Sequence, residues 1–149
     1  MRVRVAGIAE AVAVKVELVG VRDRRTVIAS VPDQVAVCRL GPSEDLPAWA
    51  TRAPVFSITR TRDELSIVCP EENIPADTRS AKGWRALRLV GTFDFAMTGI
   101  LVSVVGPLAR VGVSIFSFST YDTDYVMVLE DQLEKARKAL TDRGHTIES

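Results

Sequence analysis

The clearest indication of the fold is WRALRLVGTFDFAMTGILVSVVGPLARVG, residues 84–112. Its start is rich in leucine and valine and ends at Gly91, a pattern typical of a β-strand. From residue 97 onward apolar side chains recur every three or four positions, which predicts one buried face of a helix. Gly112 is placed to end that helix. Pro107 predicts a bend within it, because an interior proline removes a backbone hydrogen bond.

The segments that follow predict two strands, a second helix and a last strand. In chain order they are VSIFSFS (113–119), YVMVL (125–129), EDQLEKARKALTDRG (130–144) and HTIE (145–148). Asp131 and Glu134 resemble a capping box at the start of the second helix, and Gly144 is placed to end it. The resulting β-α-β-β-α-β order is that of a ferredoxin-like unit, an α+β fold.

The N-terminal half is an incomplete echo of this order. It predicts a strand, a short helix and a two-stranded hairpin, in the segments QVAVCRL (34–40), SEDLPAWA (43–50), PVFSITRT (54–61) and ELSIVCP (64–70). Residues 72–83 have too few apolar positions for a second helix. Residues 1–31 alternate loosely between apolar and polar side chains. This alternation is compatible with extra strands, but the pattern does not place them.

The composition favours a soluble cytoplasmic protein. Hydrophobic residues make up 47% of the 149 residues, enough for a core, and 19 basic residues balance 19 acidic ones. No charge excess therefore points to nucleic acid or to an anionic membrane, and no apolar run has the length of a membrane span. Charged residues interrupt the first segment, so a secretory signal fits poorly. Cys38 and Cys69 lack metal or redox spacing and are expected to be structural thiols.

A polar cluster lies between the predicted strands 113–119 and 125–129. Its residues, Ser119-Thr120-Tyr121-Asp122-Thr123-Asp124, include no glycine or asparagine, the usual hairpin residues. The loop GTFDFAMTG (91–99) precedes a helix whose N-terminus can bind a carboxylate. Asp94 and Asp124 could bind an ammonium if strand 113–119 lies beside strand 84–91. The alternative is structural: Asp94 caps the helix and the cluster is only a turn.

Signals of other chemistry are weaker. The pair Asp122 and Asp124 lacks the glycine and glutamate spacing of a calcium loop, and His145 has no nucleophile motif to serve. Phosphate-binding and dinucleotide-binding glycine loops are absent from the sequence. We therefore expect no catalytic residue, no metal and no cofactor. An enzyme that uses Asp124 as a base is the weakest alternative.

The segments LSIVCPEENIP (65–75) and 83–140, with the closing Gly144-His145, resemble the ACT-domain family. The likeness covers roughly residues 34–147 and points in particular to small tandem-ACT proteins similar to CASTOR-type amino-acid sensors. It implies tandem ferredoxin-like units: an unplaced extension (1–31), an abbreviated first unit (32–82) and a complete second unit (83–149).

The resemblance further implies a regulatory role without catalysis, with an amino acid bound at the seam between units. The residues that align with the ligand-side motifs of the family are Gly91, Asp94, Phe95, Thr98, Gly99, Ser119, Thr120 and Asp124. A homodimer or other homo-oligomer through sheet edges is expected, and the sequence does not indicate a downstream effector. A structural interaction module without a ligand is the alternative function.

Overall fold

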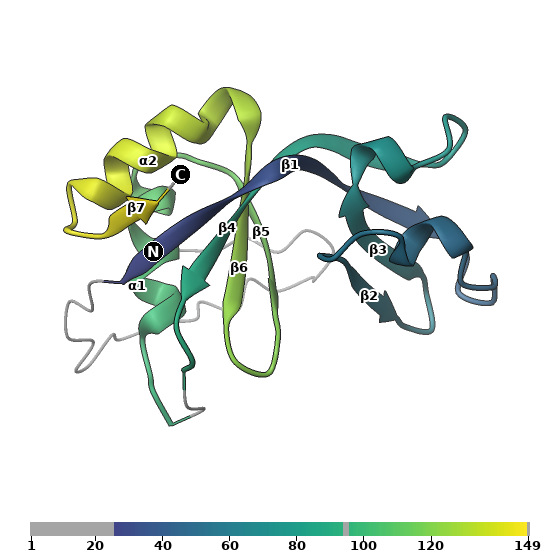
Figure 1. Ribbon diagram of the computed structural model, residues 1–149, viewed down its shortest axis with the longest axis horizontal. Helices are drawn as coiled ribbons and strands as arrows, with labels where there is room; N and C mark the ends of the chain where they lie inside the picture. Colours follow the sequence, from purple (N-terminus) through teal and green to yellow (C-terminus); the bar gives the residue numbers. More distant parts are fainter. Residues whose placement is uncertain (1–25, 94–95, 149) are drawn as a thin grey trace, which may run out of the picture.

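A computed structural model describes residues 26–93 and 96–148 of the chain. This part forms one seven-stranded sheet with two α-helices (Figure 1). The strands are β1 (Val27–Leu40), β2 (Ser57–Arg60), β3 (Leu65–Pro70), β4 (Ser80–Val90), β5 (Ile115–Ser119), β6 (Asp124–Leu129) and β7 (Thr146–Glu148). The helices are α1 (Ile100–Arg110) and α2 (Leu133–Thr141), with short 3-10 turns η1 (Ala48–Thr51), η2 (Glu71–Asn73) and η3 (Glu130–Gln132). The predicted α+β class is confirmed.

The C-terminal half has the predicted order β4-α1-β5-β6-α2-β7. One expected neighbourhood is wrong: strand β5 does not lie beside β4. Strand β6 lies between them and pairs antiparallel with both, with Leu87 of β4 opposite Val126. This pairing leaves β5 at the edge of the sheet.

Strand β1 is longer than predicted and belongs to both halves of the molecule (Figure 1). Its first residues pair with β4 and, in parallel, with β7; its last residues pair with β3 and with the start of β4. The prediction began this strand at residue 34, whereas β1 begins at Val27 and includes Pro32, a residue that is unusual inside a strand. A register shift between Ser30 and Gln34 lets the strand continue past the proline. Residues 1–25 of the predicted extension lie outside the described residues.

Both helices cover one face of the C-terminal half (Figure 1). Alternating residues of the strands point toward them, as the pleat requires. The resulting core consists of Ile28, Leu87, Leu89, Ile100, Val104, Leu108, Val113, Val126, Val128, Leu133, Ala136 and Leu140. A separate core in the N-terminal half lies beneath η1 and contains Ala36, Cys38, Ala50, Leu65, Ile67, Cys69 and Ile74.

The structure confirms some of the local predictions and overturns others. The hairpin of β2 and β3 is confirmed, and Gly112 and Gly144, both at positive φ, lie in the turns that follow α1 and α2. The capping box is wrong, because Asp131 lies inside the turn η3 and no side chain caps α2. The short helix expected at 43–50 is the 3-10 turn η1.

The cysteines are free and buried, on the neighbouring strands β1 and β3. Burial raises the pKa of the Cys69 thiol to about 12, and the adjacent Cys38 adds to the shift. Burial also raises the pKa of Cys38. Both side chains therefore remain protonated near neutral pH and pack as small apolar groups.

Pro107 and His145 are connected through one carbonyl group. Pro107 has no N–H, so the carbonyl of Ser103, four residues earlier in α1, has no helical donor. The Nε2 of the buried His145 lies 3.0 Å from that oxygen, and its Nδ1 accepts from the Thr26 N–H at 3.2 Å. The proton therefore resides on Nε2, which donates to Ser103. This ring joins α1, the start of β1 and the start of β7.

We predict that His145→Ala lowers the free energy of unfolding by about 3 kcal/mol, because it leaves the Ser103 carbonyl and the Thr26 N–H unpaired and opens a void. In a Pro107→Ala background the loss should be about 1 kcal/mol smaller, since residue 107 then has an N–H for the Ser103 carbonyl. Urea unfolding of the four proteins measures this coupling. Equal losses in both backgrounds would contradict the shared carbonyl.

Candidate functional site

A cavity of about 260 Å³ opens where β4 ends and α1 begins. One wall is the loop after β4 with the first turn of α1, and the other is the turn between β5 and β6. The lining residues are Phe93, Met97, Gly99, Ile100, Leu101, Val102, Ser119, Tyr121, Asp122, Thr123 and Asp124. The cavity belongs to the part of the chain with the strongest sequence pattern.

Two hydrogen bonds hold the walls together. The Phe93 N–H donates to the Asp122 carbonyl at 2.8 Å, and the Thr123 hydroxyl donates to the Leu89 carbonyl at 2.5 Å. The expected meeting of the 91–99 loop with the polar cluster is therefore confirmed. The two segments meet because β6, and not β5, is the strand that pairs with β4.

The turn between β5 and β6 is stabilised by its own side chains. The Thr120 N–H donates to the Thr123 carbonyl at 2.8 Å, and the Thr123 N–H donates to the Thr120 hydroxyl at 3.2 Å. The Ser119 hydroxyl donates to the Asp124 carboxylate. The threonines thus replace the glycine and asparagine of ordinary hairpins, and Ser119 fixes the orientation of Asp124.

The N-terminus of α1 faces the cavity without a cap. Its N-cap is Gly99, at φ 85°, which provides no side-chain oxygen. The first intrahelical bond runs from the Ser103 N–H to the Gly99 carbonyl at 2.9 Å. Within the described residues no side chain caps α1, so the first backbone N–H groups of the helix lack intrahelical acceptors, as at any helix N-terminus. Together with the helix dipole they form a site suited to a carboxylate.

The opposite wall is acidic. Asp124 is partly buried and Asp122 is exposed, and no lysine, arginine or histidine is among the lining residues. The cavity therefore combines N–H donors at one wall with carboxylates at the other. This arrangement complements a molecule that carries both an anionic and a cationic group, such as a zwitterion. Apolar side chains, led by Phe93, Met97 and Ile100, line the space between them.

Some of the predicted site residues line the cavity, some lie elsewhere in the structure, and two fall outside the described residues. Gly99, Ser119 and Asp124 line the cavity. Gly91 ends β4 at φ 137°, Thr98 is exposed beside the cavity, and Thr120 closes the β5–β6 turn. Asp94 and Phe95 lie outside the described residues.

The prediction also missed residues that line the cavity. Phe93, Met97 and the first turn of α1 were left out, as was Tyr121, which the pattern assigned to the turn itself. An uncapped helix start after a glycine would have pointed to Ile100, Leu101 and Val102. The described residues contain no cluster of metal-binding side chains, and no described helix has the length and hydrophobicity that a bilayer crossing requires.

A family model described as ACT domain matches residues 79–142, and a second, described as an N-terminal domain, matches residues 33–77. Protein Atu0741 from Agrobacterium tumefaciens has a solved structure with 41% identity and a TM-score of 0.80. The match covers 84% of this chain and 93% of that chain. The chain belongs to the ACT-domain family.

Curated relatives match over a shorter span. The human putative protein CASTOR3P is 35% identical over 56% of this chain and 59% of that protein. The rat cytosolic arginine sensor for mTORC1 subunit 1 is 33% identical over 56% of this chain but only 28% of its own length. The regulatory subunit of aspartate kinase from Thermus thermophilus has the same fold at 12% identity, with a TM-score of 0.58 over 80% of this chain and 99% of that one.

We predict that Thr123→Val lowers the free energy of unfolding by about 1 kcal/mol, because the Leu89 carbonyl loses its donor. For a domain of this size the melting temperature should fall by about 4 °C. Thr98→Val is the matched control, since Thr98 is exposed and has no hydrogen bond within the described residues. If the two variants melt at the same temperature, the bond does not hold the cavity walls together.

Proposed function

We propose that this chain is a non-catalytic regulatory protein that senses a free amino acid in the cavity between loop 91–99 and turn 119–124. The observation that carries the proposal is that the start of α1, which no described side chain caps, lines the same cavity as Asp124. An amino acid presents a carboxylate and an ammonium within one small unit, and these two walls offer the matching partners.

Each wall has a distinct role in this proposal. The N–H groups of Ile100, Leu101 and Val102 bind the α-carboxylate, aided by the helix dipole. Asp124 binds the α-ammonium through the carboxylate oxygen that the Ser119 hydroxyl leaves free. The ligand side chain extends past Phe93 and Met97 toward the opening of the cavity.

The charges of the lining predict which amino acids are accepted. Asp122 and Asp124 make the cavity acidic, so an aspartate or glutamate side chain would meet repulsion without a compensating cation. Apolar side chains suit Phe93 and Ile100, and a cationic side chain suits Asp122. The relatives named as arginine sensors support an amino acid as the ligand class.

Binding would act by changing how units or copies of the chain associate. A ligand shifts an equilibrium only by its difference in affinity for the two states. Strand β5 ends at Ser119, which lines the cavity, and β5 is an edge of the sheet. An exposed edge favours pairing with another strand. A homodimer through this edge would therefore place the second copy beside the ligand.

The first test is thermal unfolding of the full chain with each common amino acid. A ligand at about 100 times its dissociation constant adds about 2.7 kcal/mol, a shift of several degrees. Asp124→Asn should abolish the shift by removing the charge that binds the ammonium. Asp131→Asn, an exposed change in the turn η3 outside the cavity, should retain it. A flat panel with an intact fold would favour a structural module without a ligand.

The second prediction concerns selectivity. Aspartate and glutamate should give no stabilisation at concentrations where an apolar or basic amino acid stabilises the protein. Asp122→Asn should reduce the preference for apolar and basic amino acids over acidic ones. The substitution removes one of the carboxylates that repel an acidic side chain. Isothermal titration of both proteins with leucine, arginine and glutamate measures it. Tight binding of glutamate to the unmodified chain would contradict the proposed role of Asp122.

A further inference from the structure

The N-terminal half contains a second, separate groove of about 670 Å³. Its floor is the end of β1, and its walls are the loop that leads into η1 and the turn before β4. The lining residues are Arg39, Leu40, Glu44, Asp45, Pro47, Trp49, Pro75, Asp77, Thr78 and Arg79. None of them lines the amino-acid cavity described above.

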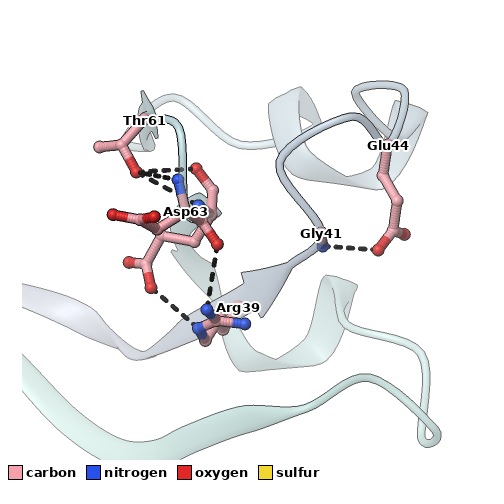
Figure 2. Close-up of polar contacts among 6 residues, drawn as sticks. Arg39, Gly41, Glu44, Thr61 and Asp63 are labelled. Carbon is pink, nitrogen blue, oxygen red and sulfur yellow. Dashed lines mark hydrogen bonds and ion pairs between the residues drawn. The ribbon is translucent and has the colours of Figure 1, made fainter.

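The wall that contains Glu44 is held in place by several hydrogen bonds. The Gly41 N–H donates to the Glu44 carboxylate at 2.6 Å, so that the side chain folds back on its own loop (Figure 2). The Arg60 guanidinium of β2 donates to the carbonyls of Pro42 and Glu44. The opposite wall is a turn in which the Thr78 N–H donates to the Pro75 carbonyl at 3.1 Å. The groove is therefore formed before any ligand binds.

The charges in the groove do not cancel. Arg39 is neutralised from outside it: its Nε lies 2.8 Å from the Glu64 carboxylate, and its Nη2 donates to the Asp63 carbonyl at 3.1 Å (Figure 2). The remaining lining has the carboxylates of Glu44, Asp45 and Asp77 and the guanidinium of Arg79. The side chains of Asp45 and Asp77 have no hydrogen bond or ion pair within the described residues. Asp45 lies on the loop that leads into η1, and Asp77 lies on the turn before β4.

Trp49 supplies an aromatic surface to the same groove. The indole is half-buried and packs against the core of the N-terminal half, which fixes the ring. The part that remains accessible lines the groove. A cation placed over an indole face is attracted by the ring quadrupole, and nearby carboxylates add to that attraction.

We propose that this groove binds a small organic cation that carries an amine or guanidinium group. The cation lies against Trp49, with Asp45 and Asp77 on either side. Two positively charged groups on one ligand would use both carboxylates, so an aliphatic diamine or a guanidino-amine fits best. This site is independent of the amino-acid cavity, and its test separates the two.

The experiment is isothermal titration of the full chain at low salt with agmatine and putrescine, and with succinate as an anionic control of similar length. The unmodified chain should bind both cations and not succinate. Asp45→Asn and Asp77→Asn should each weaken binding about tenfold. Asp124→Asn, in the other cavity, and Asp142→Asn, at the C-cap of α2, should leave the affinity unchanged.

A measurement on the unmodified chain avoids dependence on the folding of any variant. The indole N–H resonance of Trp49, assigned with Trp49→Phe, should shift as putrescine is added, and the resonance of Trp84 should not. The proposal is overturned if neither cation binds or if succinate binds instead. It is also overturned if binding is lost only in Asp124→Asn, or if Asp45→Asn and Asp77→Asn bind as the unmodified chain does.

Discussion

The antiparallel pairing of β1 with β4 is the interaction on which the rest of the structure depends. Both strands run through the two halves of the molecule, with residues such as Ile28 and Leu89 paired at one end and Cys38 and Ser80 at the other. Strands β3 and β7 attach to β1, and β6 attaches to β4. Strand β1 therefore contributes to both cores, with Ile28 in the C-terminal one and Ala36 and Cys38 in the N-terminal one, whereas β4 contributes Leu87 and Leu89 to the C-terminal core.

The cavity proposed to bind an amino acid lies where this strand pair ends. Strand β4 stops at a glycine beside the β5–β6 turn, and the chain then enters α1 through Gly99, which cannot cap the helix with a side chain. Because β6 is the neighbour of β4, the start of β6 brings Asp124 to the same end of the sheet. The start of α1 and the Asp124 carboxylate therefore line the same cavity, and the hydrogen bonds of Thr120 and Thr123 hold the β5–β6 turn in place.

Much of the C-terminal half could be predicted because its patterns are local. The 3.6-residue repeat of α1, the leucine run of β4 and the glycines after both helices depend only on neighbouring residues. The path of β1 could not, because its continuation past Pro32 depends on pairing with distant strands. The expectation that strand 113–119 lies beside strand 84–91 came from the fold type, and the pairing of β6 with both strands overturns it. The polar residues of the site stood out in the sequence, whereas Phe93 and Met97 line the cavity as apolar groups that resemble ordinary core residues.

Strand β1 also has a consequence for how the chain acquires its structure. Its start is bonded to residues near the other end of the described chain, with Thr26 contacting His145 across a sequence separation of 119. Contacts of such separation close large loops, and proteins rich in them fold slowly. During synthesis the outer edge of β1 stays uncovered until α2 and β7 have been made. An uncovered strand edge can pair with the wrong strand. The shared strand β1 therefore depends on β7, near the end of the described chain, for the last of its hydrogen-bonded neighbours.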